Sequence, residues 1–222
     1  MDTIAYDHWF TPADLIALTD RVGAQLAETC DIRSQIGKPY REAWIAARFA
    51  ATRGAQAVRL ISEKRWQTPD FAIHLDNRYL LFESTEADDP TRQRNQDYLD
   101  ACHLFLSQAD YAVLGPGPVA PDLYAEEIAR LVAKKCAKHY ARCDGLVLIS
   151  HAGWVAGLTP PPRAWWEAAC AEAQGHFPEV WVFHDRAFQR LFAAAQTPVS
   201  VPPSDTAATL PPTQTSSPSR LT

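Results

Sequence analysis

A short polar pair between two alternating segments constrains the fold of this chain more than any other feature. Asp76 and Asn77 separate residues 70–75 from residues 78–85, and both segments alternate apolar and polar side chains. Asp and Asn tolerate the positive φ angles of a two-residue hairpin turn. The sequence therefore predicts an antiparallel hairpin in which Asp70 lies opposite Glu83, with Cβ atoms about 5 Å apart.

The predicted hairpin divides its side chains between an apolar face and a face that carries two carboxylates. Phe71, Ile73 and Phe82 fall on the apolar face, whereas Asp70 and Glu83 fall together on the other. Like charges that lie opposite each other in a sheet repel, and a divalent cation would turn that repulsion into binding. Two interpretations are open: a metal site, or two carboxylates at a solvated strand end.

The rest of the sequence predicts an α/β domain with a mixed central sheet flanked by helices. The early strands follow one another directly and the later strands are linked by helices, which indicates both antiparallel and parallel pairs. We expect one domain over residues 1–195 and a disordered Pro/Ser/Thr-rich tail over residues 196–222. Besides the hairpin, periodicity and turn residues predict strands at 56–62, 146–149 and 179–183, and helices at 12–30, 39–52, 94–108, 122–142, 163–174 and 185–195.

Composition excludes several classes of protein. The formal net charge is −5, so the chain lacks the global positive field of a protein that coats nucleic acid, although this charge allows a local basic groove. No apolar run is long enough for a membrane span, and the N-terminus has neither the basic start nor the apolar run of a signal peptide. We therefore expect no membrane partner. The five cysteines are odd in number and form no CxxC pair, so we expect reduced thiols in a cytoplasmic protein and no zinc site.

Glu42 is a third acidic candidate for a site. On the predicted helix 39–52 it shares a stripe with Ile45, Ala46 and Phe49, which is the side that faces the core. A carboxylate on that stripe needs a partner or a metal ion. The alternative is an acidic side chain near a helix N-terminus, favoured there by the helix dipole and extending into solvent.

The predicted helix 122–142 carries basic residues at intervals of four. Such a stripe could follow a phosphate backbone and bind nucleic acid. An apolar row that begins at Ile128 lies on another side of the same helix, and if that row packs on the sheet, the basic stripe is a solvated face. The basic residues are Arg130, Lys134, Lys138 and Arg142.

These residues and their order resemble the PD-(D/E)XK nuclease superfamily. The shared features are a helix with an inward Glu, a strand, Pro69-Asp70 at a second strand and Glu83 on a third, followed by helices and a further strand. The resemblance covers about residues 39–150 and implies a restriction-endonuclease-like core with an N-terminal helical extension. It further implies that Asp70 and Glu83 bind Mg²⁺ or Mn²⁺, that Glu42 completes the site, and that the protein hydrolyses phosphodiester bonds in nucleic acid.

The chain departs from the family at one catalytic position. The third strand reads Glu83-Ser84-Thr85, so Thr85 stands where the family has the lysine that positions the attacking water. Threonine can hydrogen-bond a water molecule but supplies no positive charge. Lys64, at the end of the first strand, is one candidate for the basic role, and Arg92 and Arg94 are others. Two hypotheses follow: a metal-dependent nuclease, or a catalytically inactive nuclease-like domain that binds protein or nucleic acid.

Overall fold

Six strands form one mixed sheet in the computed structural model, which describes residues 2–29, 37–62, 68–88, 90, 119–150 and 161–193. The strands lie in the order in which they occur along the chain. β3 pairs in parallel with β4 and β4 with β5, and the other three pairs are antiparallel. The strands are β1 (Ala57–Leu60), β2 (Phe71–Leu75), β3 (Arg78–Ala87), β4 (Gly145–Ser150), β5 (Glu179–His184) and β6 (Ala187–Ala193). The predicted mixed sheet is confirmed.

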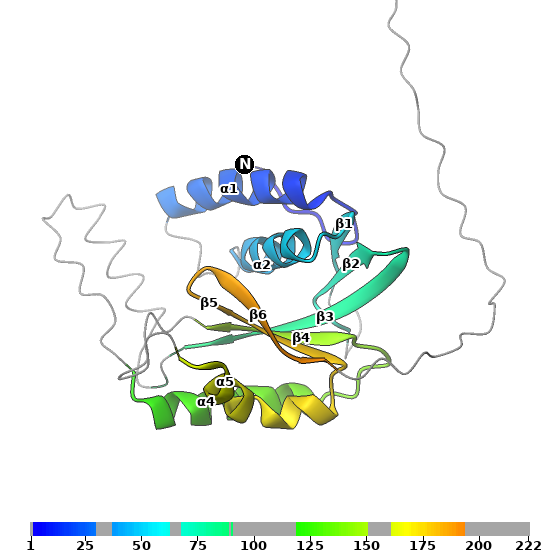
Figure 1. Ribbon diagram of the computed structural model, residues 1–222. Helices are drawn as coiled ribbons and strands as arrows, with labels where there is room; N and C mark the ends of the chain where they lie inside the picture. The colour runs from blue at the N-terminus through cyan, green and yellow to red at the C-terminus, as the bar shows by residue number, and fades with distance from the viewer. Residues whose placement is uncertain are drawn as a thin grey trace, which may run out of the picture.

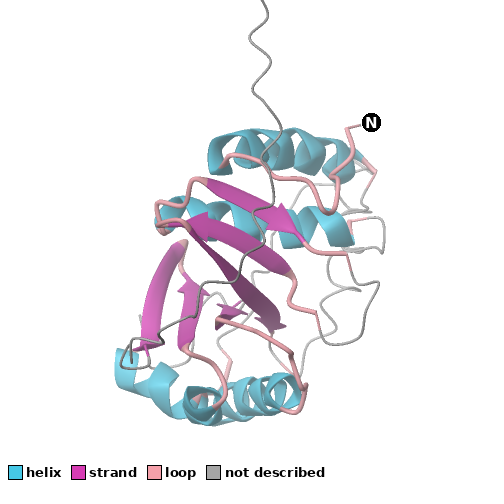
Figure 2. Cartoon of the chain, turned by 90° about the vertical axis from the view of Figure 1, so that its right-hand side faces the viewer, coloured by secondary structure: helices cyan, strands magenta, loops and turns pink. Residues whose placement is uncertain are grey.

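Helices cover both faces of this sheet, so the fold has three layers (Figures 1 and 2). One face is covered by α2 (Lys38–Thr52), with α1 (Pro12–Glu28) packed mainly on the outer side of α2 (Figure 1), and both helices were predicted. The other is covered by α4 (Pro121–Cys136), α5 (Arg163–Ala169) and the 3₁₀ helix η1 (Ala171–Gly175). Each face of the sheet therefore has its own apolar core.

The β2–β3 hairpin has the predicted register. Asp76 and Asn77 have φ angles of 50° and 58°, and Phe71 pairs with Phe82 at the far end of the ladder. Asp70 and Glu83 come one step beyond that last pair, where β2 begins and β3 continues without it. The hairpin's apolar side packs on Phe49 of α2, which meets Phe71 and Phe82 with ring centroids 5.8 Å and 4.8 Å apart. This packing fixes the position of the strand end that carries the carboxylates.

Three predicted helices differ from the structure. The helix predicted at 122–142 ends at Cys136, because the chain turns there toward the start of β4 at Gly145. The helix predicted at 163–174 is divided between α5 and η1. The helix predicted at 185–195 is wrong: Asp185 and Arg186 form a turn with φ angles of 46° and 65°, and β6 follows it, because pairing with β5 overrides the local helical preference.

Some predictions fall outside the described residues. They include the helix at 94–108, the tail at 196–222, and the candidate basic residues Lys64, Arg92 and Arg94. In the part of the chain that the structure describes, no helix combines the length and the apolar character that crossing a membrane requires.

Candidate metal-binding pocket

One cavity of about 280 Å³ lies where β3 extends beyond its pairing with β2. Its walls come from α2, from the start of β2, from β3, and from α4 with the segment that follows it. It brings together the three predicted carboxylates, Glu42, Asp70 and Glu83, and it adds four basic side chains. The lining residues are Lys38, Arg41, Glu42, Asp70, Glu83, Ser84, Thr85, Glu86, Lys135 and Lys138.

Ser84 holds the carboxylate of Asp70 in place. Asp70 Oδ2 accepts two hydrogen bonds from Ser84, one from the backbone N–H at 2.7 Å and one from the hydroxyl at 2.6 Å. Burial, followed by the charge of Glu83, raises the pKa of Asp70 above its ordinary value, although Lys135 and both hydrogen bonds act in the opposite direction. The pocket thus disfavours the charged form of Asp70, and a bound cation would favour it.

Glu83 is fully buried and is contacted by two lysines. Its Oε1 accepts hydrogen bonds from Lys135 of α4 and from Lys138, which lies two residues beyond the end of the helix. The distance from Lys138 Nζ to Glu83 Oε1 is 2.9 Å. Burial opposes the charge of Lys138, but the hydrogen bond and charge of Glu83 outweigh it and raise the pKa of that lysine. These contacts place positive charge directly beside the candidate metal ligand.

The second oxygen of Glu83 is the strongest sign that the pocket can accept a further group. Oε2 is buried and has no hydrogen-bond partner of good geometry among the described residues. The Tyr140 hydroxyl is near this carboxylate, since burial and then the charge and hydrogen bonding of Glu83 raise the pKa of Tyr140. A buried carboxylate oxygen without a well-aligned donor is costly, and a hard cation such as Mg²⁺ or Mn²⁺ takes ligands of this kind.

Glu42 faces the pocket from α2. Its side chain is largely buried, its Oε2 accepts a hydrogen bond from the Tyr6 hydroxyl at 2.8 Å, and its Oε1 lies 3.6 Å from Lys38 Nζ. The apolar stripe predicted beside it is confirmed, since Ile45, Ala46 and Phe49 are buried in the core. Glu42 therefore lies at the edge of that core, held by a tyrosine and a lysine.

The pocket contains a lysine on α4 that was not predicted. Thr85 lines the pocket, and Lys64 lies outside the described residues. Lys135 provides one of the two ammonium groups that contact Glu83. The helical spacing could have found it, because Lys135 follows Ile128 by seven residues and Val132 by three, on the side of α4 that faces the sheet.

The four basic residues predicted to form a stripe do not lie on one helix. Lys138 and Arg142 lie beyond the end of α4, so the four basic residues do not share one helix face. Arg130 is exposed and pairs with Glu127, Lys138 turns into the pocket, and Arg142 contacts the carbonyl oxygen of Tyr79 and the carboxylate of Asp144. Of these residues only Lys138 contributes to the pocket.

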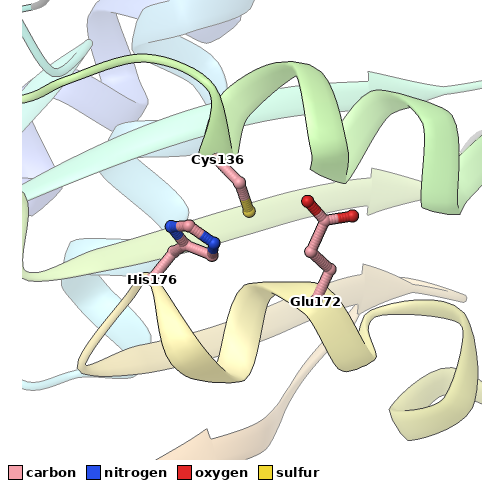
Figure 3. A group of neighbouring side chains, drawn as sticks. All are labelled: Cys136, Glu172 and His176. Atoms are coloured by element: carbon pink, nitrogen blue, oxygen red, sulfur yellow. The ribbon is translucent and has the colours of Figure 1, made fainter.

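A second group of potential metal ligands lies on α4 and η1, outside this pocket. Cys136, Glu172 and His176 each offer one ligand atom, and these atoms lie within 4.8 Å of one another (Figure 3). Cys136, Cys143 and Cys170 are free thiols, as expected, whereas Cys30 and Cys102 lie outside the described residues. The group was missed because spacing rules search for ligands close together in sequence, and these come from separate elements.

Comparisons with protein-family models, with curated proteins and with solved structures find no match to this chain.

Proposed function

We propose that this protein is a divalent-metal-dependent nuclease with a PD-(D/E)XK-like core. The observation that carries the proposal is the convergence of Asp70, Glu83 and Glu42 with Lys135 in one pocket at the free edge of β3. An antiparallel β1–β2–β3 meander followed by a helix and a parallel β4 is the element order that the resemblance implies. The carboxylate oxygens of this pocket are the kind of ligand that Mg²⁺ prefers.

Each pocket residue has a role in this proposal. Asp70 and Glu83 would hold the cation, with Ser84 orienting Asp70 and Oε2 of Glu83, which has no hydrogen-bond partner of good geometry among the described residues, available as a ligand. A bound divalent cation lowers the pKa of a coordinated water and stabilises negative charge on a phosphate oxygen. Lys135 replaces the lysine absent at Thr85: its ammonium group orients the attacking water or neutralises the phosphate.

Charges on the α2 side of the pocket suit a nucleic-acid backbone. Lys38 and Arg41 line the cavity from α2, and Lys135 and Lys138 line it from α4 and the segment after it, so a phosphodiester would have cationic groups on two sides. Arg41 lies 3.8 Å from Glu86 and Lys38 lies 3.6 Å from Glu42, which orients both cations within the pocket. We infer that these two residues contact the phosphates that flank the scissile bond.

The test compares matched pairs of variants in cleavage assays with single- and double-stranded DNA and with RNA. With Mg²⁺ or Mn²⁺, we expect cleavage by the wild type and a loss of at least about 100-fold in Asp70→Asn and in Lys135→Met. The controls are Asp76→Asn, which lies in the turn of the same hairpin, and Lys134→Met, which is the exposed neighbour on α4. The proposal fails if the controls lose as much activity as the pocket variants, or if no cation binds.

A catalytically inactive nuclease-like domain that binds protein or nucleic acid is the second candidate. It is favoured by the contact of both Lys135 and Lys138 with the same oxygen of Glu83, because two ammonium groups already neutralise the carboxylate. Calorimetric titration with Mn²⁺ distinguishes the two functions. Binding that depends on Asp70, without cleavage of any substrate, supports the inactive domain.

A further inference from the structure

Three potential metal ligands of different chemical types lie close together at the C-terminal end of α4. None of them lines the pocket. Cys136 is the last residue of α4, Glu172 lies in η1, and His176 caps the end of η1. Figure 3 shows the Cys136 sulfur between the His176 ring and the Glu172 carboxylate. Cys136 is buried, whereas Glu172 and His176 are exposed, so a small ion could reach the group from solvent.

We propose that Cys136, Glu172 and His176 form a Zn²⁺ site that joins the end of α4 to η1. Thiolate, imidazole and carboxylate are the protein ligands of Zn²⁺, and a set of three leaves the fourth tetrahedral position to water. A thiolate ligand selects Zn²⁺ over Mg²⁺, so this site and the pocket would take different cations. The inference does not depend on the proposed nuclease function.

The geometry requires only a small adjustment to bind the ion. Tetrahedral Zn²⁺ with bonds of ordinary length places its ligand atoms about 3.5 Å apart. The three ligand atoms here lie within 4.8 Å of one another, so their separations must shorten by about 1 Å. Glu172 and His176 can make that movement because both side chains are exposed, while Cys136 stays fixed by its packing.

The end of α4 also favours a cation beside the thiol. The carbonyl ends of the last turn of α4 give this position a partial negative charge, which favours a cation. On binding, the thiol releases its proton to solvent and the sulfur forms a bond to the metal, a step that needs no oxidant or reductant.

The site would stabilise the element that carries the pocket lysines. Cys136 directly follows Lys135, and Lys138 lies two residues further along the chain. A bond from Cys136 through the ion to η1 would restrain the last turn of α4, from which Lys135 reaches Glu83. Zinc binding is therefore expected to increase the thermal stability of the whole chain.

Co²⁺ is the probe for the test, because a thiolate bound to Co²⁺ produces a charge-transfer absorption in the near ultraviolet. In the full chain we expect this band to appear at one Co²⁺ per chain and to disappear when Zn²⁺ is added. Cys136→Ser should abolish the band. Glu172→Gln and His176→Gln should each weaken Co²⁺ binding by at least about tenfold, and both exposed positions can be changed without loss of the fold.

The matched controls are Cys143→Ser, Glu126→Gln and His8→Gln, each of which should retain the band and the affinity. The Cys143 thiol lies 3.3 Å from the carbonyl oxygen of Gly145 and is not part of the group, and the other two positions are exposed. The proposal is overturned if the wild type gives no band, if the band persists in Cys136→Ser, or if both Glu172→Gln and His176→Gln bind Co²⁺ as the wild type does.

Discussion

Helix α4 takes part in two ion-pair clusters that differ chiefly in burial. Arg130 pairs with Glu127 at 2.6 Å, with 63% of the arginine side chain and 17% of the glutamate side chain exposed. Lys135 pairs with Glu83, whose side chain is 0% exposed. Exposed pairs contribute little to stability, whereas a buried carboxylate depends on its cations. The two pairs should therefore differ in how strongly the fold depends on their charged partners.

The largest effect is expected when Glu83 loses both lysines. In the double variant Lys135→Met/Lys138→Met, the buried carboxylate has no ammonium partner, and the free energy of unfolding should fall by about 3–5 kcal/mol at neutral pH. Urea denaturation at neutral pH measures this loss. An equal loss in the exposed control Lys134→Met would remove the contrast between the two clusters.

Arg53 and Glu179 provide a pair of intermediate burial. Arg53 Nη1 lies 2.6 Å from Glu179 Oε1, with 16% and 13% of the two side chains exposed, and the guanidinium lies 5.0 Å from the Trp181 ring centroid. Arg53→Met should lower the free energy of unfolding by about 2 kcal/mol through loss of the charged hydrogen bond. Arg53→Lys, which keeps the charge, should lose less. If Arg53→Met lowers the free energy of unfolding as little as a change in the exposed pair does, burial does not determine how much an ion pair contributes to stability.

Asp70 should give the pocket a pH dependence that the exposed pair lacks. Its pKa is raised above the ordinary value of 3.8, by burial and then by Glu83, so the folded state binds the proton more tightly than the unfolded state. The stability contributed by this proton is present below pH 3.8 and is lost as the pH rises through the raised pKa. Asp70→Asn mimics the protonated form, so without metal it should be more stable than wild type at neutral pH.

Thermal unfolding of both proteins across a pH series checks this prediction. The two melting temperatures should converge in acid and separate as the pH rises. A variant that is less stable than wild type at neutral pH would show that the hydrogen bonds from Ser84 outweigh burial at Asp70.

The smallest effect is expected at the exposed pair. Arg130→Ala and Glu127→Ala should each change the free energy of unfolding by less than about 0.5 kcal/mol, and added salt should reduce the difference further. A double-variant cycle isolates the interaction between the two side chains. A coupling energy as large as that of the buried cluster would show that exposure does not weaken ion pairs on this helix.

The carboxylate end of the site was predictable from the sequence because a turn and an alternating pattern fix the register together. Asp76-Asn77 sets the turn, and a slip of one residue would move Phe71 and Phe82 from the core face to the other face. Glu42 was predictable from helical spacing alone. These features are local, so the three carboxylates could be assigned to one region.

The basic end of the site was less predictable because it depends on where α4 ends and on contacts distant in sequence. The basic and apolar rows continue in helical register to Arg142, and no glycine marks the end at Cys136. β6 was missed for a related reason. Asp185-Arg186 is a weak turn signal, and its partner β5 supplies the pairing that makes residues 187–193 a strand.

The order of the strands has a consequence for biosynthesis. Because spatial order equals chain order, each strand leaving the ribosome finds its one new neighbour already made, and the sheet can grow from β1 toward β6. Until α4 is synthesised, the face of β3 that carries Glu83 is open to water, so the carboxylate stays hydrated. Glu83 is then expected to lose its water only when Lys135 and Lys138 pack against it. The nascent chain would thus avoid an intermediate in which a charged carboxylate is buried without a partner.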